Sequence, residues 1–137
     1  VVANLLEEEK ASLHPDRLAT FRQTVDAQLS AFRGKLEEYR RAGLKVAGYG
    51  APARVATICN YGRIGPELIE FIVDDSPLKQ HRHSPGTHIP IVPAAHLAAH
   101  RPDVLVVFAY EYFDDIKKKL NGGAYRYLIP IPPREVA

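Results

Sequence analysis

The chain has 137 residues, of which 46% are hydrophobic and 25% are charged. This composition is ordinary for a globular domain and excludes a disordered tail, a fibre and a membrane protein. The longest apolar run, Val104 to Tyr110, is far shorter than the ~20 residues of a membrane-spanning helix, and a net charge of +2 is too small to favour nucleic acid as a partner. A lone cysteine, Cys59, indicates a reducing, cytoplasmic setting. Because the sequence holds no methionine, we expect it to be part of a longer protein.

The first expected element is a long helix over residues 16–42. Asp16 is a suitable N-cap, and Gly43 is a suitable C-terminal stop. Apolar residues recur at gaps of three or four, which is the helical period, at Leu18, Phe21, Val25, Leu29, Phe32, Leu36 and Tyr39. We therefore divide the chain into a helical lead-in, residues 1–43, and an α/β domain, residues 44–137.

After Gly43 short apolar strands alternate with helices. We expect strands at 44–49, 68–73, 89–91, 103–108 and 125–131, and helices at 51–61, 94–100 and 112–121. A polar loop joins the second and third strands, and Pro90 places the third strand at a sheet edge.

This order predicts an α/β fold. We expect a Rossmann-like, five-stranded, mainly parallel sheet with flanking helices, preceded by the long N-terminal helix. Ligands of such sheets lie beyond the carboxyl ends of the strands. Here that edge is formed by the loops after Tyr49, Val73 and Phe108.

The first candidate site is the strand–turn–helix sequence G-Y-G-A-P-A-R, which begins at Gly48 and matches the dinucleotide fingerprint G-x-G-x-x-A. Gly50 would let a phosphate approach the backbone, and the helix start at Ala51 would offer N–H groups. Asp74 ends the second strand at a spacing suited to ribose hydroxyls. The alternative is that small residues, including Ala53, simply let a strand enter a helix.

Cations provide the second candidate. Arg54 lies in the first helical turn, where it opposes the helix dipole, so either a bound anion compensates it or it is a solvated surface arginine. In the loop, Lys79 and Arg82 could hold phosphate, and His88 could orient a sugar hydroxyl or a phosphate. The loop histidines match no common zinc spacing, so we assign no metal.

The third candidate is Tyr110, at the end of the fourth strand, which either stacks on a base or caps the core. Tyr61, with Asn60 beside it, is a weaker candidate. The sequence contains no nucleophile elbow, Walker lysine motif or paired catalytic carboxylates, so we assign no catalytic residue. This pattern favours a binding unit whose chemistry lies in a neighbouring domain.

Several strings together resemble one family. They are G-Y-G-A-P-A-R from Gly48, C-N-Y-G from Cys59, V-D-D-S-P-L-K-Q from Val73 and P-G-T-H-I-P-I from Pro85. The family is the C-terminal domain of SAM-dependent C-methyltransferases that act on nucleotide-linked deoxysugars. The resemblance covers nearly the whole chain, and P-G-T-H-I-P-I is its most specific part. The family's fourth strand commonly ends in Ala-Trp-Asn, whereas this sequence reads A-Y-E up to Glu111.

The resemblance implies a Rossmann-like domain that binds no cofactor itself and is not catalytic alone. SAM and zinc would belong to upstream parts of the parent enzyme. The implied partners are a nucleotide-sugar-like small molecule and the upstream methyltransferase domain. The candidate substrate-binding residues, from the resemblance and the patterns above, are Gly48, Gly50, Ala51, Ala53, Arg54, Lys79, Arg82, His88 and Tyr110.

Two other hypotheses stay open at this point. A dinucleotide-binding domain of an oxidoreductase would use G-x-G-x-x-A and would need Asp74 free for ribose. A non-catalytic interaction module would use the long helix as a docking face.

Overall fold

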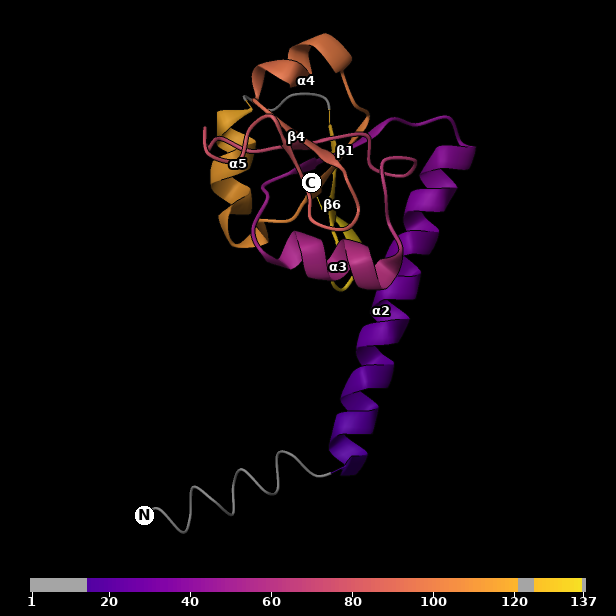
Figure 1. Cartoon of the computed structure of the whole chain (residues 1–137). Helices are drawn as coiled ribbons and strands as arrows, with labels where there is room; N and C mark the ends of the chain where they lie inside the picture. The colour runs from indigo at the N-terminus through magenta and orange to yellow at the C-terminus, as the bar shows by residue number, and fades with distance from the viewer. Residues whose placement is uncertain (1–14, 121–124, 137) are drawn as a thin grey trace.

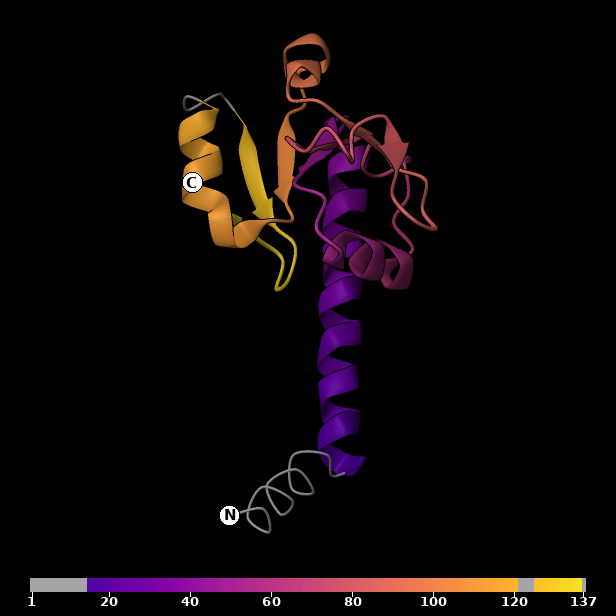
Figure 2. The same ribbon diagram turned by 60° about the vertical axis from the view of Figure 1, so that its left-hand side comes forward.

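The long N-terminal helix has two unlike halves. The computed structural model describes residues 15–120 and 125–136, and its first element, α2, spans Pro15–Arg41. Its buried residues, Leu29, Phe32, Leu36 and Tyr39, all lie in the second half of the helix. The first half runs on past the sheet, as both views show (Figures 1 and 2). No helix in the described part of the chain has the length and apolar content needed to cross a membrane.

The helix ends as the sequence predicts. Gly43 adopts φ +76°, and its N–H donates to the Arg40 carbonyl oxygen at 3.0 Å. A left-handed residue just beyond the last turn is a common helix stop, and glycine adopts it without steric cost. The predicted helix over 16–42 is therefore confirmed to within one residue at each end.

One sheet of seven strands forms the centre of the molecule, in the order β3-β4-β2-β1-β5-β6-β7. The strands are β1 (Val46–Tyr49), β2 (Ile72–Val73), β3 (Arg82–His83), β4 (Pro90–Val92), β5 (Val104–Val107), β6 (Arg126–Ile129) and β7 (Arg134–Val136). The five predicted strands form the parallel part, β4-β2-β1-β5-β6, although the one predicted over 68–73 is reduced to β2. β3 and β7 add an antiparallel strand at each edge.

The predicted number of five strands is therefore wrong. The two additional strands are short and mostly polar, and β3 lies in the segment predicted to be a loop. Neither has the alternation or the apolar run by which a strand is found in sequence.

The position of β4 also differs from the prediction. Pro90 was expected at an edge, but β4 lies between β2 and β3. The backbone bonds to β3 are His81 N–H to Ile91 O and Ser84 N–H to Ile89 O, both 2.8 Å. They use the residues on either side of Pro90, so its missing N–H costs no bond to β3.

Helices cover both faces of the sheet. The helices after α2 are α3 (Arg54–Gly62), α4 (Ala95–His100), the short 3-10 helix η1 (Tyr110–Tyr112) and α5 (Phe113–Lys119). α2 and α3 pack on one face, while α4 and α5 lie on the other (Figure 2). Val46 joins the first core, and Ala47 and Tyr49 join the second, because successive strand residues face opposite sides.

Two helices depart from their predicted bounds. α3 begins at Arg54 and not at residue 51, because residues 51–53 form the turn that leaves β1. The predicted helix over 112–121 is divided into η1 and α5, and its last residue lies outside the described residues.

Candidate functional site

The carboxyl ends of the central strands form a small crevice. β1 pairs with β2 on one side and β5 on the other, which is the switch point of this topology. The crevice has a volume of about 270 Å³. We call it the switch-point crevice. It is lined by Tyr49, Gly50, Asp74, Asp75, Ala109, Tyr112, Asp115, Ile116 and Lys119.

The fingerprint glycines are used for packing. A Cβ atom on Gly48 would lie 2.9 Å from Cε2 of Phe108 and 3.0 Å from Cγ1 of Ile72. Gly50 has φ +86°, and a Cβ there would lie 2.7 Å from Cβ of Ala109. Both glycines are thus required by neighbouring side chains of the fold itself.

Asp74 ties the turn after β1 to the turn after β2. Its Oδ2 accepts the Ala51 N–H at 2.8 Å, and its Oδ1 accepts the Ser76 N–H at 2.8 Å. The side chain is only 13% exposed. The Ala51 N–H, predicted to meet a phosphate, is therefore engaged by a carboxylate, and Asp74 is not free to bind ribose.

The remaining charges of the switch-point crevice are mainly negative. Asp74, Asp75 and Asp115 line it, Lys119 is the one cation among the described lining residues, and Lys79 Nζ lies 3.9 Å from Asp74 Oδ2. Lys119 Nζ donates to Asp75 Oδ2 at 2.6 Å, and the Tyr49 hydroxyl donates to the same oxygen at 3.3 Å. Burial, and secondly the Asp75 charge, raise the pKa of Tyr49 to about 12. The carboxylates of the crevice would repel the negative charge of a phosphate.

A larger hollow lies between α2 and α3, with a volume of about 850 Å³. We call it the α2–α3 groove. Its walls are mostly apolar and include Leu18, Phe21, Val25, Ile58, Tyr61 and Ile131, with Arg54 and Tyr110 among the polar members. Phe21 is 68% exposed and Tyr61 is 77% exposed, which is unusual for large apolar side chains.

Two of the predicted site residues meet at this groove. The guanidinium carbon of Arg54 lies 4.6 Å from the centre of the Tyr110 ring, in a cation–π contact. Arg54 Nη2 also donates to Oε1 of Glu111. This hydrogen bond is the main cause of a raised pKa at Arg54 and a lowered pKa at Glu111, so both groups are charged at neutral pH.

The predicted loop cations do not come together. Lys79 Nζ donates to the Ala51 carbonyl oxygen at 3.0 Å and lies 3.9 Å from Asp74 Oδ2, so it is at the turn after β1. Arg82 is exposed in β3, and neither hollow is lined by Lys79, Arg82 or His88. The His88 ring makes an edge-to-face contact with His83 at 6.3 Å between ring centres.

Asn60 fixes the turn that carries His88. Its Nδ2 donates to the Pro85 carbonyl oxygen at 2.9 Å and to the Ala56 carbonyl oxygen at 2.7 Å. Gly86 has φ +82°, a conformation that favours glycine, and a Cβ there would lie 2.3 Å from Oδ1 of Asn60. The string P-G-T-H therefore packs directly against α3.

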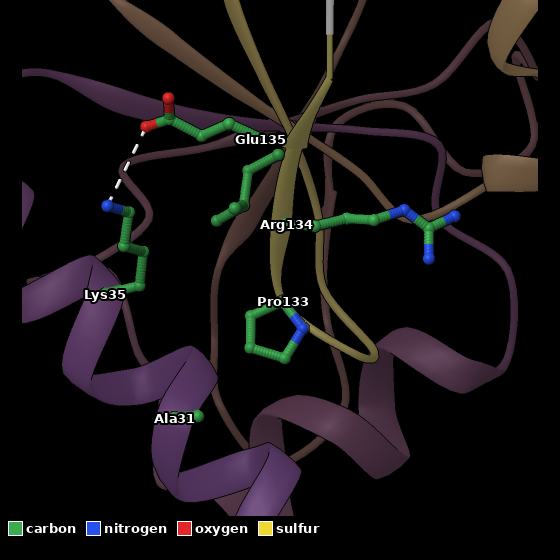
Figure 3. A pocket seen from close by; sticks show the side chains of 6 residues that line it. Ala31, Lys35, Pro133, Arg134 and Glu135 are labelled. Carbon is green, nitrogen blue, oxygen red and sulfur yellow. Dashed lines mark ion pairs between the residues drawn. The ribbon is translucent and has the colours of Figure 1, made fainter.

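A third hollow lies on the other side of α2, with a volume of about 410 Å³. Lys35 of α2 and Glu135 of β7 point toward one another across it, with Nζ and Oε1 3.9 Å apart (Figure 3). Glu135 also accepts from the Tyr39 hydroxyl at 2.5 Å and from Arg126 at 2.6 Å. The contacts of Lys35 and Tyr39 join β7 to α2, and the bond from Arg126 joins β7 to β6, so we assign this hollow a structural role.

The described residues include no group of three or more His, Cys, Asp or Glu side chains placed to hold a metal ion. The only described cysteine, Cys59, is buried, and burial raises the pKa of its thiol to about 12. The thiol is therefore protonated and unreactive at neutral pH.

Comparison with known protein families identifies the family of this chain. The family described as the C-methyltransferase C-terminal domain matches residues 1–132. The chain belongs to this family. The resemblance found in the sequence strings is thereby confirmed.

The chain is also similar to a full-length enzyme, the C-methyltransferase NovU of Streptomyces niveus. The two sequences are 36% identical over 100 residues. The match covers 69% of the chain but only 24% of the relative, so the chain spans about a quarter of that enzyme's length.

Sequence reasoning found only part of the groove in this C-methyltransferase C-terminal domain. Arg54 and Tyr110 were predicted site residues, and Tyr61 was a weaker candidate. The sequence did not predict that Leu18, Phe21 and Val25 line the groove. Helical periodicity shows that these side chains share one face of the helix, but it does not show that the sheet leaves this part of the face uncovered.

Proposed function

We propose that this domain binds the acceptor of a SAM-dependent C-methyltransferase and that the acceptor is a nucleotide-linked sugar. The family supports the methyltransferase part of this proposal. The observation that carries the acceptor part is the Arg54 guanidinium stacked on Tyr110 at the wall of a large, mostly apolar groove.

The α2–α3 groove suits such a ligand in size and chemistry. Its volume of about 850 Å³ lies within the common range of roughly 300–1,000 Å³ for small-molecule sites. An arginine donor fork matches phosphate oxygens, and an exposed tyrosine ring such as Tyr61 offers a face for a base. We therefore assign the diphosphate to Arg54 and the base to the aromatic wall.

The loop residues complete the proposal. Lys79 at the turn after β1, Arg82 in β3 and His88 close to it bring further positive or hydrogen-bonding groups, and we propose that the sugar or the far end of the ligand lies toward them. A phosphate at the Ala51 N–H would require Asp74 to give up its bond, so we give the side chain of Arg54 the leading part. In this proposal Gly48, Gly50 and Ala53 do not contact the ligand but allow the tight turn that places Arg54.

The switch-point crevice does not fit SAM or a dinucleotide. The switch-point crevice is about 270 Å³, and the two fingerprint glycines have side chains of the fold against them. We therefore place SAM, which supplies the methyl group when bound, and any zinc in other parts of the parent enzyme. This domain would act by holding the acceptor in a fixed position toward the methyl donor, which lowers the entropic cost of reaction.

The proposal also accounts for the exposed apolar side chains in the first half of α2. Phe21 and Leu18 are the kind of large apolar side chains that a second domain covers. We propose that the upstream methyltransferase domain lies against them. The buried lone thiol of Cys59 fits a reducing, cytoplasmic compartment for the whole enzyme.

Isothermal titration of the chain with dTDP-glucose tests the acceptor proposal. We expect saturable binding that Arg54→Ala weakens about ten-fold or more, because a charge-assisted contact to phosphate is lost. Arg82→Ala should weaken it less. Arg41→Ala, an exposed cation at the far end of α2, is the matched control and should leave the affinity unchanged. Equal affinities of the wild type and Arg54→Ala would remove Arg54 from the site.

A further inference from the structure

Arg54 already has an anionic partner on its own chain. Its guanidinium is held between the Tyr110 ring and the carboxylate of Glu111. The two charged side chains remain accessible, at 34% exposed for Arg54 and 48% exposed for Glu111. An incoming anion can therefore reach the pair from the solvent.

The pair is one that an anion can open. Exposed ion pairs contribute little to stability because water and salt compensate their separation. The stacking of Arg54 on Tyr110 does not depend on Glu111, since the ring supplies its own face to the guanidinium. Glu111 can thus turn away while Arg54 keeps its place at the groove.

Glu111 keeps a negative charge beside Arg54 whether or not the two are in contact. Each negative charge brought to Arg54 by a ligand is then repelled by the carboxylate, and the repulsion grows with the charge of the ligand. In a sugar-linked diphosphate each phosphate carries one ester bond and one anhydride bond, so each has a single ionisable oxygen. The terminal phosphate of a free nucleoside diphosphate is bound only through the anhydride and has a second ionisation near pH ~6, so the free nucleotide carries one further negative charge at neutral pH.

We infer that Glu111 is a specificity-determining residue, which competes with the ligand diphosphate for Arg54 and thereby favours a sugar-linked nucleotide over the free nucleoside diphosphate. This inference rests on the proposed function, because it assumes that Arg54 meets the diphosphate. Its consequence is that the domain discriminates against a nucleotide that carries no sugar to be methylated.

The test compares dTDP with dTDP-glucose by isothermal titration of the wild type and Glu111→Gln. We expect Glu111→Gln to bind dTDP about five-fold more tightly and dTDP-glucose by a smaller factor, so that the preference for the sugar-linked nucleotide falls. In the Arg54→Ala background, Glu111→Gln should lose most of its effect on both affinities.

The chain offers a matched control. Arg33 and Glu37 form a similar pair on α2, with Nε and Oε1 3.0 Å apart and exposures of 36% and 43%. Glu37→Gln removes the same charge away from the groove and should change neither affinity.

The outcomes separate the two proposals. If the wild type binds dTDP-glucose and Glu111→Gln leaves the ratio of the two affinities unchanged, the inference about Glu111 is overturned and the proposed function stands. If neither the wild type nor Glu111→Gln binds either nucleotide, both are overturned. Tighter binding of dTDP by Glu37→Gln would show a general charge effect and would also overturn the inference.

Discussion

The switch-point crevice and the α2–α3 groove differ in almost every physical property. The crevice is small and acidic, and its polar groups bond to one another. The groove is about three times larger and mostly apolar, and it has an arginine on an aromatic ring at its wall. In Rossmann-like folds the crevice is the usual place for a ligand. Here side chains of the fold leave only a crevice of about 270 Å³ at that place, and the fold offers a larger hollow elsewhere.

The G-x-G-x-x-A motif can therefore form its usual turn without binding a dinucleotide. G-x-G-x-x-A requires only that small residues stand in the turn, and in this domain Phe108 and Ala109 are what require them. The turn that leads into α3, where a pyrophosphate normally binds, instead has Asp74 Oδ2 bonded to the Ala51 N–H. A nucleotide fingerprint beside a small crevice with bonded N–H groups thus indicates the topology and not the ligand.

The strongest prediction tests whether the crevice is closed by packing. Gly50→Ala should lower the free energy of unfolding by about 2–4 kcal/mol, because a Cβ would lie 2.7 Å from Ala109 on a residue with φ +86°. Gly34→Ala is the control: nothing lies within 4 Å of a Cβ there, and alanine should stabilise the exposed helix by about 0.5–1 kcal/mol. Urea denaturation measures both. A Gly50→Ala variant as stable as the wild type would mean that the crevice has room for a ligand.

The next prediction concerns the carboxylate that occupies the turn. Asp74→Ala leaves two backbone N–H groups without their acceptor and should lower the free energy of unfolding by about 1–3 kcal/mol. Asp75→Asn, which alters an exposed pair with Lys119, should cost about 0–1 kcal/mol. Equal effects of the two substitutions in urea denaturation would contradict a structural role particular to Asp74.

The smallest effect is expected at the third hollow, which we regard as structural. The Tyr39 hydrogen bond, then the one from Arg126, lowers the pKa of Glu135. A depressed carboxyl pKa stabilises the fold above the unfolded value of about 4.3, and this contribution is lost as the pH falls through the lower folded value. Glu135→Gln should therefore reduce stability by less than about 1 kcal/mol near neutral pH, and the difference should shrink in acid.

Tyr39→Phe is the matched variant for that measurement, since it keeps the ring and removes the hydroxyl donor. It should show part of the same loss, and the double variant should lose less than the sum of the two. A difference between Glu135→Gln and the wild type that grows as the pH falls would contradict the assignment.

Much of the fold could be predicted from the sequence. The periodicity of α2 and the apolar runs of the central strands each reflect burial on a regular period, which is a local property. The strands β3 and β7 could not be predicted in this way, because Arg82, His83 and Arg134 carry no apolar pattern. β3 and β7 form strands because they pair with the backbones of β4 and β6, and this pairing depends on the tertiary structure.

The candidate site was predictable in its residues more than in its geometry. Arg54 was expected in the helical turn after the first strand and Tyr110 at the end of the fourth, and the pairing of β1 with β5 brings them together. The bond from Ala51 to Asp74 was not expected, because it depends on how closely two turns approach across the sheet. The binding roles of Lys79, Arg82 and His88 remain predictions.

The most direct test of where the ligand lies is a ¹H–¹⁵N spectrum of the chain titrated with dTDP-glucose. Binding in the α2–α3 groove predicts that the largest shifts fall on the amides of Arg54, Thr57, Tyr61 and Tyr110 and on the exposed half of α2, while Tyr49, Asp75 and Asp115 change little. The largest shifts at Tyr49, Gly50 and Asp75 would instead place the ligand in the switch-point crevice and contradict the assignment of the groove.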